Sequence, residues 1–212
     1  MRKIYLAALA LALAAMPLSA QSSPYAPNGP IPPYLEFKTG MNYSPIDAGA
    51  VVNTVREVGM NVGLGLVMPV TKNFSFSLGV NYSERGLERT LSGLPTLLDL
   101  TYIEVPALFR FRLMSAGPVS VNALFGASGG YEFDCAASVV GPAAPTDCSG
   151  AIHDYDIGGL LGLGLSFGIN DVMALGVDGT YYTGMRTIGV GALDGIMNST
   201  WTVQSRVGFS VF

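Results

Sequence analysis

Hydrophobic and polar residues alternate along most of this chain. The alternation is clearest over 101–113, TYIEVPALFRFRL, where every second side chain is apolar and the positions between them include Glu104, Arg110 and Arg112. A period of two residues is typical of a β-strand with two different faces. The run is longer than the usual strand of about six residues, and it fits the roughly 9 to 11 residues with which a strand crosses a bilayer. It therefore predicts a strand with one face toward lipid.

The same pattern predicts eight strands in all. They cover 34–43, 58–70, 73–83, 101–113, 119–131, 154–170, 172–186 and 199–212. Long loops at 44–57, 84–100, 132–153 and 187–198 alternate with short turns. Outer-membrane barrels have long extracellular loops and short periplasmic turns. Residues 34–212 are therefore predicted to be all-β and to form an eight-stranded antiparallel up-and-down transmembrane β-barrel. Both termini are expected in the periplasm.

The composition supports a membrane environment. The chain has 212 residues, of which 50% are hydrophobic and only 12% are charged. Soluble domains have about 25% charged residues. Beyond the N-terminal segment, polar residues and glycines interrupt every apolar run, so a spanning helix of about 20 residues is not expected. A closed barrel is the other fold that satisfies all backbone groups in lipid.

The N-terminus has the pattern of an export signal. Arg2 and Lys3 precede an apolar run, and Leu18-Ser19-Ala20 suits cleavage, so 1–20 is predicted to be a signal peptide. The Pro-rich segment 21–33 is predicted to be an extended leader. Removing two of the 11 basic residues leaves 9 against 15 acidic ones, a net charge of −6. Nucleic-acid binding, which needs a basic surface, is not expected.

The two cysteines, Cys135 and Cys148, lie in one predicted loop. Export favours a disulfide between them, and two free thiols are the alternative. Two cysteines with one distant histidine, His153, make only a weak metal site, so we predict no metal and no cofactor.

The inward face of the predicted barrel has equal numbers of acidic and basic residues. These residues are Glu36, Lys38, Glu104, Arg110, Arg112, Asp156, Asp178 and Arg206. Because an eight-stranded barrel is only wide enough for its own side chains, we expect a salt-bridged plug in which neighbouring basic groups share Glu104. A gated proton or ion path along the same groups is the alternative. The inward glycines leave volume for these side chains, or else a narrow lumen for a small lipophile.

Two further features give expectations about the strands. Pro106 is expected to remove one ladder donor in mid-strand, and a bulge there would re-aim Glu104 and Arg110. Aromatic residues gather near the two ends of the predicted strands and are expected to form interfacial girdles. The girdle at the long-loop end comprises Tyr43, Tyr82, Tyr102, Tyr131, Tyr155, Tyr181, Tyr182 and Trp201, and the other comprises Phe74, Phe109, Phe111, Phe167 and Phe209.

An enzymatic alternative rests on His153. It lies beside Asp154 and Asp156 at the predicted outer rim, which is compatible with a hydrolase on a small barrel. No second catalytic signature accompanies it, so we predict that the protein is not an enzyme.

Three segments resemble the PorT-like outer-membrane β-barrel family, which is common in Bacteroidetes and related bacteria. The similarity covers roughly 34–212. The segments are Tyr102-Ile103-Glu104-Val105-Pro106 with Leu108 and Arg110, Asp154-Tyr155-Asp156-Ile157-Gly158 with Gly162 and Gly164, and Tyr182-Thr183-Gly184-Met185 with Ile188. The resemblance implies a small outer-membrane barrel without catalysis, and a few such relatives serve a secretion apparatus. We therefore expect a monomer with a structural, docking or envelope-assembly role, in contact with outer-membrane lipid and possible envelope or secretion partners. A narrow channel or lipophile carrier is the alternative.

Overall fold

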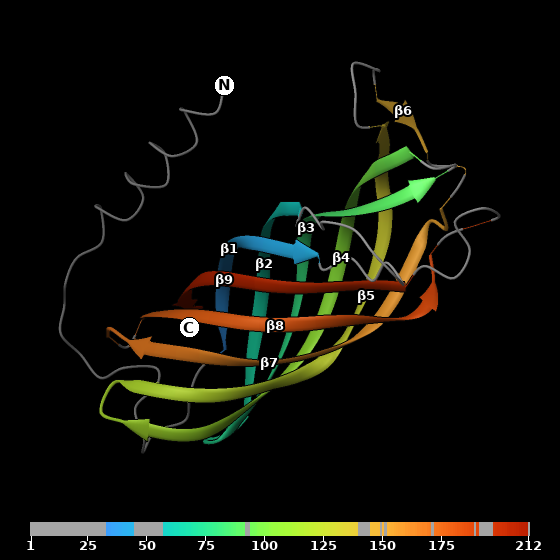
Figure 1. The fold of residues 1–212 in the computed structure, drawn as a ribbon. Helices are drawn as coiled ribbons and strands as arrows, with labels where there is room; N and C mark the ends of the chain where they lie inside the picture. The colour runs from blue at the N-terminus through green and yellow to red at the C-terminus, as the bar shows by residue number, and fades with distance from the viewer. Residues whose placement is uncertain are drawn as a thin grey trace.

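The computed structural model describes residues 33–44, 57–91, 94–139, 145–148, 150, 152–170, 172–188, 190 and 197–211. Its elements are nine strands (Figure 1): β1 Tyr34–Ser44, β2 Glu57–Thr71, β3 Phe74–Leu91, β4 Leu94–Ala116, β5 Val119–Val139, β6 Thr146–Asp147, β7 Tyr155–Gly168, β8 Met173–Thr187 and β9 Met197–Ser210. The predicted signal peptide at 1–20 lies outside these residues, as does the predicted leader at 21–33 except for Pro33. In the described part of the chain, no helix has the length and apolarity needed to span a membrane.

Eight of the strands close into an antiparallel barrel. Each of these strands pairs with its neighbour along the chain, β5 pairs with β7, and β1 pairs with β9 from Tyr34↔Ser210 to Tyr43↔Trp201. β6 adds only two residues at the edge of β5. The structure confirms the prediction of an eight-stranded up-and-down barrel.

Alternation places apolar side chains outside and polar side chains inside. Leu64, Leu161 and Leu163 are 62%, 66% and 61% exposed, whereas Glu36 and Asp178 are fully buried. An apolar outer band with a polar interior is the arrangement that a barrel needs in lipid. Side-chain parity along each strand therefore decides which residues can meet in the lumen.

Three strands are much longer than predicted. β3 and β4 pair from Phe74↔Phe111 to Leu91↔Leu94, so most of the predicted loop 84–100 is strand. β5 continues through Val139 and takes up the start of the predicted loop 132–153. The loop prediction was wrong because it followed the charged ERGLER sequence, whereas a strand beyond the bilayer has no need of an apolar outer face. With 23 residues, β4 is about twice as long as a bilayer crossing requires.

These additional pairs form a sheet beyond the barrel, which we call the β3–β5 extension. It comprises 84–91 of β3, 94–101 of β4, 132–139 of β5, and β6. β2 pairs with β3 only as far as Asn61↔Ser83, and β7 pairs with β5 only as far as Tyr131↔Tyr155. In Figure 1 the extension rises past the other strands toward β6.

An apolar cluster packs on the inward face of the β3–β5 extension. It contains Leu98, Leu100, Tyr102, Cys135, Cys148, Ile152 and Ile188. Cys135 and Cys148 form a disulfide with a Cα–Cα distance of 5.3 Å, which confirms that prediction. Leu98, Leu100 and Tyr102 share the inward parity of β4, so this cluster lies at the long-loop end of the lumen.

Pro106 lies in β4 without a bulge. Toward β5 the register is regular through Val105↔Gly129 and Pro106↔Ser128, whereas toward β3 no pair forms at these two positions. The two register shifts of the β4–β5 ladder lie between Thr101 and Tyr102 and between Arg112 and Met114. Pro106 therefore does not re-aim Glu104 and Arg110 through a bulge. A strand residue directs its N–H to one neighbour only, so the proline interrupts one ladder and leaves the other intact.

The aromatic residues form two groups, with two exceptions to the prediction. Near the long-loop end, Tyr131 packs on Tyr155 and Tyr181 packs on Trp201, with ring centroids 5.3 Å and 4.8 Å apart. Near the short turns, Phe109 packs against Phe74, Phe76 and Phe125. Tyr102 and Tyr182 are buried and face the lumen, so assigning them to the lipid girdle was wrong. Their even-numbered positions have the inward parity of β4 and β8.

Candidate functional site: two charged layers in the lumen

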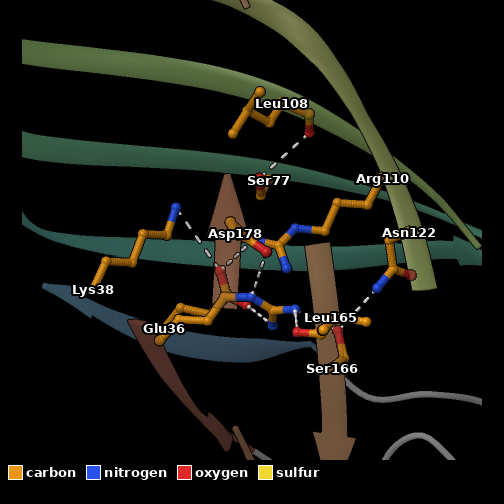
Figure 2. A network of polar contacts seen from close by, with 10 residues as sticks. Glu36, Lys38, Ser77, Leu108, Arg110, Asn122, Leu165, Ser166 and Asp178 are labelled. Atoms are coloured by element: carbon orange, nitrogen blue, oxygen red, sulfur yellow. Dashed lines mark hydrogen bonds and ion pairs between the residues drawn. The ribbon is translucent and has the colours of Figure 1, made fainter. Parts of the chain in front are cut away.

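A layer of five charged residues crosses the lumen on the side of the short turns. We call it the short-turn layer, and it consists of Glu36 and Lys38 on β1, Arg110 on β4, Asp178 on β8 and Arg206 on β9. Figure 2 labels the first four of these residues. Arg110 Nη2 lies 3.0 Å from both Glu36 Oε2 and Asp178 Oδ2. Arg206 binds the same two carboxylates, through Nη1 to Glu36 Oε1 at 2.9 Å and through Nε to Asp178 Oδ1 at 3.1 Å. Both guanidinium groups therefore bridge the same two acids.

Further donors surround this arrangement. Lys38 Nζ lies 3.8 Å from Glu36 Oε2. Arg206 Nη2 donates to the Leu165 carbonyl at 3.3 Å and to Ser166 Oγ. Ser166 Oγ also accepts a hydrogen bond of 2.9 Å from Asn122. Residues from β1, β4, β5, β7, β8 and β9 thus meet in one network across the lumen.

Glycines on neighbouring strands provide the room for these charges. The facing pairs are Glu36↔Gly65, Lys38↔Gly63, Asp178↔Gly164 and Arg206↔Gly176. A Cβ at Gly176 would collide with the Arg206 guanidinium, and one at Gly65 would come within 3.2 Å of Lys38 Nζ. In a barrel of this width, a glycine on one strand leaves room for a long charged side chain on the neighbouring strand.

A second charged group lies closer to the long loops. We call it the long-loop layer, and it consists of Arg85 on β3, Glu104 on β4 and Asp156 on β7. Arg85 Nη2 lies 2.6 Å from Glu104 Oε1, and Nη1 lies 3.6 Å from Asp156 Oδ2. Asn198 donates to Asp156 Oδ2 at 2.9 Å. The Arg85 guanidinium also lies over Tyr182, with its Cζ 4.2 Å from the ring centroid, in the geometry of a cation–π contact.

The lumen is electrically asymmetric along its axis. The short-turn layer has three cations and two carboxylates, whereas the long-loop layer has one cation and two carboxylates. Arg112 adds a further cation at the short-turn end. At the other end, Glu132 adds an acid just beyond Tyr131, where burial and the adjacent Asp154 raise the pKa of its carboxyl. The short-turn half therefore has excess positive charge and the long-loop half has excess negative charge.

Seven of the eight predicted interior residues are buried, and Arg112 is the exception. Glu36, Lys38, Glu104, Arg110, Asp156, Asp178 and Arg206 are buried, whereas Arg112 is half-buried and forms no ion pair with the described residues. The predicted sharing of Glu104 differs from the structure, in which its one ion-pair partner among the described residues is Arg85 and the shared acids are Glu36 and Asp178. Arg110 lies six residues from Glu104 along β4, too far along the axis to reach it.

Sequence reasoning missed Arg85 because it placed the residue in a loop. The signal was present in the alternation of Asn81, Ser83 and Arg85, since all three have inward parity if the strand continues. His153 is half-buried, and its backbone N–H donates to the Ile188 carbonyl at 2.7 Å. In the described part of the chain, no three His, Cys, Asp or Glu side chains are grouped so that they could hold a metal ion.

Two solved structures to which this chain is similar are of bacterial surface proteins. At 14% identity, the chain matches the crystal structure of Neisserial surface protein A with a TM-score of 0.50, covering 84% of this chain and 96% of that one. The attachment invasion locus protein Ail of Yersinia pestis is 18% identical with a TM-score of 0.42, covering 84% and 97% of the two chains. No curated protein matches the sequence.

A family assignment comes from the sequence as a whole. Residues 20–188 match the family described as "Outer membrane protein beta-barrel domain". This match covers well over half of the chain and agrees with the closed barrel and its apolar outer surface. The chain belongs to the outer-membrane protein β-barrel domain family of the bacterial outer membrane.

Proposed function

We propose that this protein is a non-conducting barrel with a structural and docking role in the outer membrane. The observation that carries the proposal is the short-turn layer, in which two arginines bridge Glu36 and Asp178 across the lumen. A permanent aqueous path would need these groups to part, and each would then lose a charge-assisted hydrogen bond. In an eight-stranded barrel, little other space remains for an ion to pass.

The docking part of the proposal rests on the β3–β5 extension. Its strands continue beyond the length needed to cross a bilayer, and they have their own apolar cluster and disulfide. A rigid sheet outside the membrane offers a partner a preformed surface, which lowers the entropic cost of association. We place the extension on the extracellular side and the termini in the periplasm, because exported barrels have their long connections outside. A role beside a secretion apparatus is supported only by the resemblance to PorT-like proteins.

Conductance separates this proposal from a channel. In planar bilayers, the purified protein is expected to show no steady single-channel steps. A variant with Glu36, Lys38 and Arg206 all replaced by alanine loses most of the short-turn layer and is expected to show conductance steps, and heat-modifiable gel mobility checks that it is folded. Steady steps of uniform size from the unmodified protein would contradict the proposal and favour the channel.

Site-specific cross-linking tests the docking role. Asp99 is exposed on the β3–β5 extension, so a photo-reactive residue there is expected to link to an envelope protein in intact cells. The matched control is the same residue at Leu161, whose side chain is 66% exposed on the lipid-facing surface. Protein adducts at both positions, or at neither, would remove the support for a specific docking surface.

A further inference from the structure

The short-turn end of the lumen has a small cationic cavity that the ion-pair network leaves open. Its volume is about 30 Å³, and its lining includes Lys72 in the β2–β3 turn and Arg110 and Arg112 on β4. The other lining residues are neutral polar ones, among them Asn73 and Asn122, together with the apolar Pro69 and Phe74, and none of the lining residues is acidic. A cavity of this size takes one or two oxygen atoms.

Two arginines that line this cavity have a buried donor without an acceptor. Arg110 is 4% exposed, and its Nε has no hydrogen-bond partner even though Nη2 binds two carboxylates. Arg112 Nε is also buried without a partner. Burying a charged donor without an acceptor costs free energy. The second register shift of the β4–β5 ladder, between Arg112 and Met114, lies directly beside Arg112.

The charge count favours an anion at this end. Lys38, Arg110, Arg112 and Arg206 face two carboxylates, which leaves an excess of two positive charges before Lys72 is counted. The acids of the long-loop layer already bind Arg85. An anion that enters from the short-turn mouth offsets the excess positive charge without breaking the ion pairs of the short-turn layer.

From this geometry we infer that the short-turn mouth is a binding site for a phosphate group. Arg110 and Arg112 are two residues apart on one face of β4, so their Cα atoms are separated by about 6.6 Å. A phosphate has several oxygens and can accept hydrogen bonds from the guanidinium groups of both arginines, which suit this geometry. Lys72 contributes a further positive charge at the rim. The phosphate comes either from free solution or from a lipid headgroup on the short-turn side.

Arginine side-chain NMR provides the test. In dodecyl maltoside micelles, inorganic phosphate titrated against chloride at constant ionic strength is expected to shift two arginine Nε–H resonances in a saturable way. Arg112→Gln should remove one of these resonances and weaken phosphate binding at the other at least about tenfold. Arg186→Gln removes the same charge from an exposed position at the opposite end and should leave binding unchanged.

Two further measurements make the test decisive. Arg112 belongs to no ion pair of the described residues, so Arg112→Gln should retain the heat-modifiable gel mobility of the folded barrel. Transfer into phosphatidylglycerol nanodiscs without added phosphate identifies the source, because a headgroup ligand would move the two resonances to their bound positions there. The inference would be overturned if phosphate gave no saturable shift in micelles and the resonances stayed unshifted in nanodiscs, or if binding were undiminished in Arg112→Gln.

Discussion

Replacing Arg206 with methionine should destabilise the folded barrel by about 3 to 5 kcal/mol. The substitution removes the bonds to Glu36 and Asp178 and those to Ser166 and the Leu165 carbonyl. Methionine retains much of the volume, so the loss is mainly electrostatic. Two carboxylates that are fully buried would then share Arg110 as their remaining bridge. Urea unfolding in lipid vesicles, followed by heat-modifiable gel mobility, measures this loss.

A paired substitution distinguishes electrostatic loss from lost packing. Arg206→Met combined with Asp178→Asn removes one charge of each sign, so the double variant is expected to be more stable than Arg206→Met alone. Arg186→Met at an exposed position should change stability by less than about 0.5 kcal/mol. If the double variant is at least as unstable as the sum of its two single variants, the charges are not coupled as the distances indicate.

Replacing both Cys135 and Cys148 with serine should loosen the β3–β5 extension while the barrel stays folded. The disulfide closes a short loop, with a sequence separation of 13, and removing a cross-link of this size costs about 3 kcal/mol. It also anchors the segment near Cys148 against Leu98 and Leu100. Hydrogen exchange of the backbone amides in 94–101 and 132–139 is therefore expected to accelerate.

The barrel itself provides the internal control for the disulfide. Amides of β1 and β9, which pair far from the disulfide, should exchange as slowly as before. Reducing the disulfide of the unmodified protein should reproduce the effect of the double substitution. Unchanged protection in 94–101 after both treatments would mean that the β3–β4–β5 pairing alone holds the extension.

Strand parity explains how far the lumen could be predicted. Glu36, Lys38, Arg110, Asp178 and Arg206 all occupy inward positions of the predicted alternation, and the structure places them in the lumen. Parity does not tell which inward residues meet, because that depends on strand tilt and on the stagger between neighbouring strands. Glu104 illustrates this point, since it was expected to be shared by several bases and instead pairs with Arg85.

The β3–β5 extension could not be predicted from the same alternation. Inside the bilayer, lipid imposes an apolar face and makes strands visible in the sequence. Beyond the bilayer, water accepts polar groups on either face, so Glu84 and the residues that follow it had the pattern of a solvated loop. Pairing with β4, through Glu84↔Thr101 and onward, is what keeps that segment in a strand.

By itself the sequence determined the export signal pattern, the number of spanning strands, their inward and outward faces and the pair of cysteines. These features follow from local periodicity and composition, which are properties of the sequence and do not depend on tertiary contacts. Only the tertiary structure decided that Arg110 and Arg206 bridge the same acids, that Arg85 joins Glu104, and that Arg110 Nε and Arg112 Nε remain without acceptors. These are contacts between strands far apart in sequence, and the closure of the barrel brings them together.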